Sequence, residues 1–123
     1  MGFGKNLGIQ LYVEDVAKEK EFYRTIGFEI IEEAEMMGYD YVTMKTCSEA
    51  NVLFTLYASD FIRQVSPEVI DMKPSILFET EDIVALHEKV AEVTDDCSQI
   101  SLQPFKNFNF GTPSGMHFAV KEP

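Results

Sequence analysis

Histidine and cysteine, the side chains most often found in metal sites and as bases or nucleophiles near neutral pH, are scarce in this sequence, and none of them forms a recognised catalytic motif. The 123 residues include two histidines, His87 and His117, and two cysteines, Cys47 and Cys97. The cysteines lack C-x-x-C spacing, and neither has an activating neighbour. No glycine-rich phosphate loop and no nucleophile elbow is found. The sequence therefore gives no support to phosphate-binding or covalent chemistry.

His117 and Glu79 are the two side chains that we single out as a candidate general base or as groups that orient a ligand. Each also has a simpler interpretation: a structural hydrogen bond for His117, and a solvated carboxylate at a strand end for Glu79. His87 lies within "ALHEK", in a predicted helix, and we expect it to face solvent. The catalytic residues, if the protein is an enzyme, are unknown from the sequence.

Charge restricts the partners that this chain can have. It carries 21 acidic and 10 basic residues, for a net charge of −11. Such a surface repels nucleic acids and anionic membranes and attracts cationic ligands, although solubility alone also explains it. The acidic run "EIIEEAEMM" (29–37) fits either a negative rim for a cation or, as we favour, a charged sheet edge. We expect neither nucleic acid nor membrane as a partner.

Length and composition predict one globular domain covering residues 1–123. The hydrophobic content of 46% is enough for a sizeable core, and the charged fraction of 25% is ordinary. No segment is long and apolar enough to span a bilayer, and no signal peptide is recognised at the start. With two isolated cysteines, which we interpret as reduced thiols, we expect a cytoplasmic protein.

Two segments of the chain follow the same plan of strand, helix and strand. In "GIQLYVEDVAKEKEFYRTIGFEI" (8–30) apolar residues alternate up to Val13, Asp15 is a natural helix N-cap, and Gly27 is a natural helix end. In "SILFETEDIVALHEKVAEV" (75–93) Asp82 takes the place of Asp15, and an apolar stripe follows at helical spacing. This repetition indicates an internal duplication.

Further β-type segments complete each half. We expect strands near 28–34, 39–45 and 51–57 in the first half, with a turn at Met37-Gly38, and near 98–102, 105–110 and 115–121 in the second. The predicted fold class is α+β, with two βαβββ modules at about 5–58 and 74–123 and a linker at about 59–73.

This arrangement resembles the vicinal oxygen chelate superfamily, which includes glyoxalase I, extradiol dioxygenases and bleomycin-resistance proteins. "VEDVAKEKEFYRTIGFEI" is similar to the opening pattern of the family, a strand ending in Asp, a helix with Phe-Tyr, and then Leu-Gly-Phe. "FNFGTPSG" is similar to its closing pattern, Phe-x-Phe-x-Asp-Pro-x-Gly, with Thr112 in place of the Asp. The resemblance implies curved sheets around a cleft, and a homodimer.

The resemblance also implies where a metal would be held. The corresponding positions here are Gly8, Thr55, Ser75 and Ala119. None is His, Asp or Glu, and a Ser or Thr hydroxyl is a poor sole ligand for a transition metal. We therefore expect no metal and no other cofactor.

Alternation along the predicted strands then indicates which residues would line that cleft. The expected ligand-binding residues are Gln10, Tyr12, Thr55, Tyr57, Leu77, Phe108 and His117. Aromatic walls with a few polar groups suit a small organic ligand. The phenylalanines at 105, 108 and 110 are also good core residues, and we favour the core for them.

The sequence therefore favours a metal-free binding protein of the glyoxalase/bleomycin-resistance type that sequesters a small organic compound, with a cation preferred by the charge. The alternative is a lyase- or isomerase-type enzyme of the glyoxalase/dioxygenase superfamily with a displaced or absent metal site. Whether the protein catalyses a reaction is left open, and the ligand itself is not identified.

Overall fold

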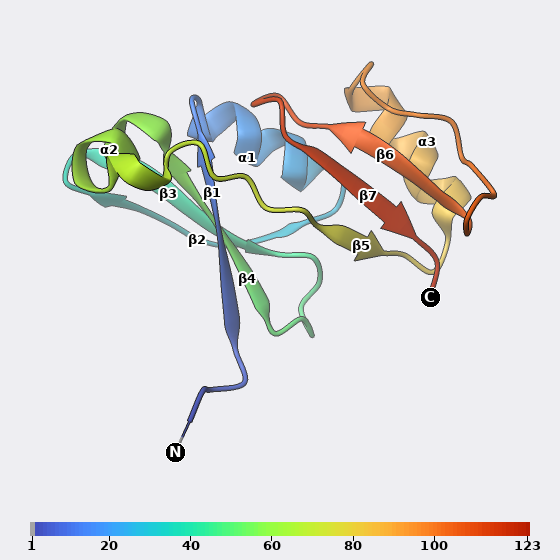
Figure 1. The fold of residues 1–123 in the computed structure, drawn as a ribbon, viewed down its shortest axis with the longest axis horizontal. Coiled ribbons are helices and arrows are strands. Elements are labelled where there is room, and N and C mark those ends of the chain that lie inside the picture. The colour runs from blue at the N-terminus through green and yellow to red at the C-terminus, as the bar shows by residue number, and fades with distance from the viewer. Residues whose placement is uncertain (1) are drawn as a thin grey trace. The chain divides into compact units, whose positions relative to one another are not determined.

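A computed structural model describes residues 2–123 of the chain (Figure 1). The chain divides into two compact units, one reaching to Lys73 and the other running from Pro74 to Pro123. Each unit has its own β-sheet and its own core. The predicted α+β class is confirmed.

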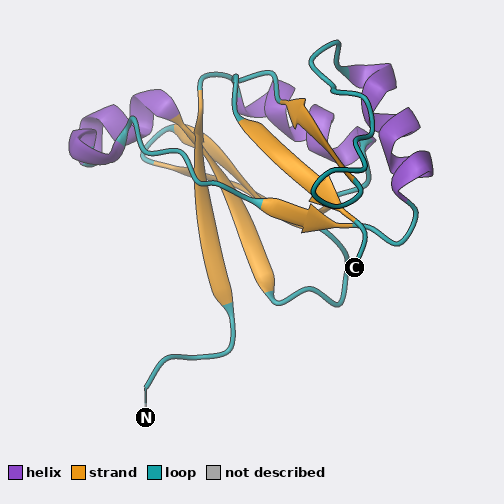
Figure 2. Ribbon diagram, turned by 45° about the vertical axis from the view of Figure 1, so that its right-hand side comes forward, coloured by secondary structure: helices purple, strands orange, loops and turns teal. Residues whose placement is uncertain are grey.

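The first unit contains a four-stranded sheet with the order β1-β4-β3-β2. Its strands are β1 (Leu7–Val13), β2 (Glu29–Met36), β3 (Tyr39–Lys45) and β4 (Val52–Ala58). β1 and β4 run parallel to each other, whereas β3 is antiparallel to both of its neighbours. Figure 2 draws the strands in orange and the helices in purple. Its helices are α1 (Val16–Thr25) and α2 (Ser59–Val65), followed by a 3-10 turn at Pro67–Val69. The segment predicted as a linker, 59–73, therefore contains helical structure.

Helix α1 packs on one face of this sheet and closes the core of the first unit. The strand side chains that point toward it alternate with those that do not, as a pleated sheet requires. The buried strand residues are Leu11, Val13, Val42, Met44, Phe54 and Leu56. From the helix side, Phe22, Tyr23 and Ile26 complete this core.

Helix ends lie where the capping residues predict them. The Asp15 carboxylate accepts a hydrogen bond from the Lys18 backbone N–H at 3.1 Å, and Asp82 caps its helix in the same way through Ala85 N at 3.1 Å. Gly27 follows the last turn of α1 with a φ of 116°, a conformation that glycine adopts without strain. The predicted N-caps and the predicted glycine end are confirmed.

The turn between β2 and β3 also lies at the predicted residues. Met37 and Gly38 both have positive φ, at 53° and 82°. Two such residues in succession form the tight turn whose twist matches an antiparallel pair of strands. The acidic run 29–37 therefore occupies β2, an outer strand of the sheet, and the turn, as the sheet-edge interpretation requires.

The second unit contains a three-stranded sheet with the order β5-β7-β6. Its elements are β5 (Leu77–Glu79), α3 (Ile83–Val93), β6 (Asn107–Gly111) and β7 (His117–Lys121). As in the first unit, the first strand pairs in parallel with the last, which agrees with the inferred duplication. The core lies between α3 and one face of the sheet and includes Ile83, Val90, Phe108, Phe110, Phe118 and Val120.

The strand predicted near 98–102 does not form. Only isolated bridges occur there, between Cys97 and Phe110 and between Ser101 and Asn107. Ser98 Oγ instead accepts a hydrogen bond from Asn109 N at 2.9 Å, and Ser101 Oγ bonds to both backbone groups of Gln103. Serine hydroxyls compete with a neighbouring strand for hydrogen bonds to the backbone. The apolar pattern of this segment, from which the strand was predicted, carries no information about that competition.

We expect the Asp15→Ala and Asp82→Ala variants each to lower the free energy of unfolding by about 1 kcal/mol, because an orphan backbone N–H loses its acceptor. Urea denaturation followed by circular dichroism measures this. Asp71→Ala is the control, since Asp71 is exposed and caps no helix, and it should change stability by less than about 0.5 kcal/mol. Equal effects for all three variants would contradict the capping role.

Candidate functional site

The sheet of the first unit has a face opposite α1 that is rich in tyrosine and threonine, which we call the first open face. Strand register brings Gln10 beside Thr55 and Tyr12 beside Tyr57, and it brings Tyr41 and Thr43 beside Tyr57 and Thr55 from the other side. These residues alternate with the buried core residues along each strand. The four predicted ligand-binding residues of the first unit therefore share one face.

Aromatic rings follow one another along this face. The Tyr57 ring centroid lies 5.8 Å from that of Tyr41 and 5.8 Å from that of Phe61, and Phe61 in turn lies 5.7 Å from Tyr39. Tyr39, Tyr41 and Tyr57 are each half-buried, so their rings are held in place and still reach solvent. Phe61 is buried and supports the row from within. The tyrosine rings provide flat contact area for an organic molecule and an electrostatic attraction for a cation.

Polar groups accompany the rings on the same face. The Thr43 and Thr55 hydroxyls lie 3.5 Å apart, and the Tyr12 hydroxyl donates to Gln10 Oε1 at 3.3 Å. Hydroxyl and amide groups can exchange these bonds for bonds to a ligand, because each can donate and accept. The face thus combines apolar contact with a few hydrogen-bonding groups.

Helix α2 positions Phe61 within the aromatic row, between Tyr57 and Tyr39. Arg63 on this helix donates from Nη2 to Glu14 Oε1 at 2.6 Å and from Nη1 to Asp60 Oδ1 at 2.9 Å. Glu14 follows β1 directly, so the ion pair ties α2 to the end of that strand. The hydrogen bond from Arg63 lowers the pKa of Glu14, whose carboxylate therefore stays charged around neutral pH.

The sheet of the second unit has an equivalent face, which we call the second open face. Register places Leu77 beside Ala119, Glu79 beside Lys121 and, on the other side of β7, Gly111 beside His117. Lys121 Nζ lies 3.5 Å from Glu79 Oε2 and 6.0 Å from the ring centroid of Phe105, which is exposed. Glu79 is therefore paired with a lysine rather than with His117.

His117 instead pairs with Asp96, a residue that sequence reasoning did not single out. Its Nε2 lies 2.6 Å from Asp96 Oδ2. The backbone holds Asp96 in place, because Gly111 N donates to Asp96 O at 2.7 Å and Asp96 N donates to Thr94 Oγ1 at 3.1 Å. The only sequence signal was the acidic pair Asp95-Asp96 just after the predicted helix, and it did not specify a partner.

Gly111 makes room for this pair. A Cβ atom at this position would collide with the Asp96 carboxylate and would lie 3.1 Å from His117 Nε2. The absence of a side chain at the glycine of "FNFGTP" is therefore what allows Asp96 to reach His117, and the motif alone did not indicate this.

Two sequence predictions are corrected in the second unit. Phe108 is completely buried, and its position on β6 directs it toward α3, away from the second open face. Its ring centroid lies 5.0 Å from that of His87 in an edge-on arrangement. His87 is half-buried and its Nε2 lies 2.8 Å from Ser98 O, so it does not simply face solvent.

Thr112, which replaces the Asp of the closing motif, acts in the β6–β7 turn. Its hydroxyl accepts a hydrogen bond from Met116 N at 3.3 Å, and its backbone pairs with Met116 and Gly115. A threonine hydroxyl can hold a turn in the same way as an aspartate carboxylate, although more weakly. The substitution therefore preserves the turn.

The side chains at the implied metal positions do not fit a divalent metal. Gly8 and Ala119 carry no donor atom, and Thr55 and Ser75 carry only hydroxyls. Within residues 2–123, no three His, Cys, Asp or Glu side chains come together in a way that could hold a metal ion. No metal-dependent step follows from this donor set.

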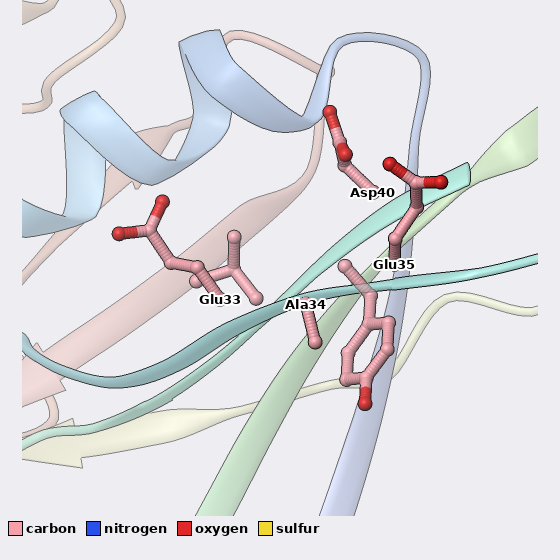
Figure 3. Close-up of a pocket in the computed structure, with 6 residues that line it drawn as sticks. Glu33, Ala34, Glu35 and Asp40 are labelled. Carbon is pink, nitrogen blue, oxygen red and sulfur yellow. The ribbon is translucent and has the colours of Figure 1, made fainter. Parts of the chain in front are cut away.

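The β2–β3 hairpin carries a surface hollow of about 300 Å³, lined by Glu33, Ala34, Glu35, Asp40, Tyr41 and Val42. Figure 3 shows the carboxylates of Glu33, Glu35 and Asp40 on one side of the hairpin and Ala34 on the other. Glu33 is engaged with Lys20, whose Nζ lies 2.9 Å from Glu33 Oε1. Two residues of the first open face line the hollow, Tyr41 and its cross-strand partner Ala34.

Comparison with known proteins gives a family match over the first part of the chain. Residues 7–47 match the family model described as bleomycin resistance protein-like N-terminal. No curated protein sequence matches the chain significantly. No helix among residues 2–123 has the length and apolar character needed to cross a membrane.

Solved structures match over nearly the whole chain. TnmS3, an antibiotic-binding protein from Streptomyces sp. CB03234, is 19% identical with a TM-score of 0.80, covering 100% of this chain and 98% of that one. A glyoxalase/bleomycin resistance protein/dioxygenase superfamily member from Sphaerobacter thermophilus is 20% identical with a TM-score of 0.74, covering 98% of each. Lactoylglutathione lyase from Agrobacterium tumefaciens is 16% identical with a TM-score of 0.71, covering 98% and 95%.

The chain has the glyoxalase/bleomycin-resistance fold. The predicted resemblance is thus confirmed by the family model over the opening strand–helix–strand segment and by the fold over the whole chain.

Burial, together with the negative charge of Asp96, raises the pKa of the Cys97 thiol. We therefore expect Cys97 to react slowly with iodoacetamide at pH 8, since a raised pKa leaves less thiolate at that pH. The rate is measured by mass spectrometry in a Cys47→Ser background, because Cys47 is exposed. Asp96→Asn should increase the rate about twofold by removing the charge, and the control Asp95→Asn should leave it unchanged. A faster reaction in the control alone would contradict the assigned cause.

Proposed function

We propose that this protein binds a small organic molecule on the first open face and sequesters it without converting it. The observation that carries the proposal is the neighbouring pair of half-buried Tyr41 and Tyr57 rings beside the Thr43 and Thr55 hydroxyls, with the buried Phe61 ring supporting Tyr57 from behind. This combination suits recognition of an organic compound by flat apolar contact with a few directed hydrogen bonds. Gln10 and Tyr12 extend the same face along β1.

A cationic ligand fits this face best. The chain carries a net charge of −11, so its field draws cations from a distance. Tyrosine rings attract cations at short range through their electron-rich faces. TnmS3, which has a similar fold, is an antibiotic-binding protein, and this supports a role for our chain in binding compounds of that kind.

The proposal includes no metal, because the implied ligand positions lack imidazole and carboxylate groups. It also includes a homodimer in the cytoplasm, which follows from the family resemblance and from the reduced cysteines rather than from the fold. Leu77 and His117 are proposed as ligand-binding residues of the second unit, on its own open face. Phe108 is no longer included, because it is buried beneath α3.

An enzyme is the second candidate, favoured by one observation. An imidazole hydrogen-bonded to a carboxylate, as in the His117–Asp96 pair, is a common arrangement for a general base. A metal-independent lyase or isomerase could use such a base. Turnover of a ligand, lost in His117→Ala, would favour this candidate over sequestration.

We expect Tyr57→Leu to weaken the binding of bleomycin at least about fivefold, because the central ring of the row is lost. Isothermal titration calorimetry measures the affinity, and circular dichroism verifies that the variant is folded. Val84→Ala is the matched control, since Val84 is an exposed apolar residue on α3. Unchanged affinity in Tyr57→Leu would exclude the first open face as the site, and no binding of bleomycin to the wild type would exclude sequestration of this drug type.

Elemental analysis gives an independent check. We expect protein purified without chelator to contain less than about 0.1 equivalent of any divalent transition metal, because hydroxyls alone hold such ions poorly. A thermal-shift panel of Ni, Zn, Fe and Mn salts should raise the melting temperature by no more than about 1 °C at equimolar ion. One equivalent of any of these metals would contradict the metal-free proposal.

A further inference from the structure

The His117–Asp96 pair leaves one imidazole nitrogen available. Asp96 Oδ2 lies 2.6 Å from His117 Nε2, so a charged Asp96 fixes the proton of a neutral ring on Nε2. Nδ1 is then an acceptor with a free lone pair. Within residues 2–123, no group forms a hydrogen bond with Nδ1. The side chains of His117 and Asp96 are both 62% exposed, so a ligand can reach this nitrogen.

Within residues 2–123, neither His117 nor Asp96 forms a salt bridge with a lysine or an arginine. The residue beside His117 on β6 is Gly111, and the next residue on the same face of β7 is Ala119. Lys121, a basic residue on the same face of β7, already pairs with Glu79 at 3.5 Å. With a neutral imidazole, the pair therefore has a net negative charge and one exposed acceptor.

We propose that the His117–Asp96 pair binds the N–H group of an organic cation, such as a protonated amine or an amidinium. His117 Nδ1 accepts the hydrogen bond, the Asp96 carboxylate supplies the charge, and Asp96 acts as a positioning residue that keeps the proton on Nε2. The inference rests on the proposed function in that it assumes an organic cation as the ligand. It adds the requirement for an N–H donor, which the tyrosine face does not impose.

Three probes separate charge from hydrogen-bond donation. Benzamidinium is a cation with N–H donors, phenyltrimethylammonium is a cation without them, and benzamide is a neutral N–H donor. Because the chain has only two histidines, ¹⁵N–¹H NMR of the imidazoles resolves His117 from His87 once His117→Ala has assigned the signals. The spectra are recorded at a pH where the ¹⁵N shifts show His117 to be neutral.

We expect the free wild-type protein to show His117 protonated on Nε2. Benzamidinium should shift the Nδ1 signal, whereas phenyltrimethylammonium and benzamide should leave it in place. In His117→Ala the affinity for benzamidinium should fall about tenfold, the effect of one charge-assisted hydrogen bond, with less than a twofold change for phenyltrimethylammonium.

Asp96→Asn and Asp95→Asn form a matched pair, because each removes one carboxylate and only Asp96 touches the imidazole. Asp96→Asn should lose the preference for the Nε2 proton and bind benzamidinium several-fold more weakly. Asp95→Asn should keep both the tautomer and the affinity. An equal loss in the two variants, or a wild-type tautomer protonated on Nδ1, overturns the inference.

The results also distinguish this inference from the proposed function. If phenyltrimethylammonium binds and Tyr57→Leu weakens it, while benzamidinium leaves the His117 nitrogens unmoved, the N–H site is overturned and the proposed function stands. If neither cation binds to the wild type but bleomycin does and depends on Tyr57, the N–H site is overturned and the proposed function stands. If bleomycin does not bind either, both are overturned. If benzamidinium shifts Nδ1 but no probe depends on Tyr57, the tyrosine face is overturned and the N–H site stands.

Discussion

The parallel pairing of the first strand with the last is the constraint on which each unit depends. In the first unit it aligns β1 with β4, so that Leu11 and Leu56 face α1 while Tyr12 and Tyr57 share the opposite face. In the second unit it aligns β5 with β7. Because side chains alternate along a strand, one paired register assigns a whole face to the core and leaves the other for ligands.

The functional proposals follow from the side chains that lie on the two open faces. The implied metal positions hold residues that bind metals poorly or not at all. The proposed ligand contacts are therefore made by aromatic rings, hydroxyls and one imidazole. The first open face provides contact area, and the His117–Asp96 pair provides an acceptor. The strongly negative net charge favours cations on both.

Much of the fold could be predicted because its signals are local. Asp15, Asp82 and Gly27 mark helix ends through bonds to neighbours a few residues away, and Met37-Gly38 marks a turn in the same way. The strand prediction that failed concerns a segment in which side chains compete with a neighbouring strand for backbone hydrogen bonds. The segment 98–102 has strand-like residues, but serine hydroxyls and a single bridge at each end replace the ladder.

The candidate site could be predicted only in part from the sequence. Alternation by itself placed Gln10, Tyr12, Thr55 and Tyr57 on one side of their strands and His117 opposite Phe118, because the period of a strand is a local property. Which distant groups meet was decided by tertiary structure alone. Asp96 lies 21 residues before His117 and reaches it because backbone bonds to Gly111 and Thr94 hold it there and because a glycine leaves the space. A contact between side chains that far apart depends on how the chain packs, and no local pattern encodes it.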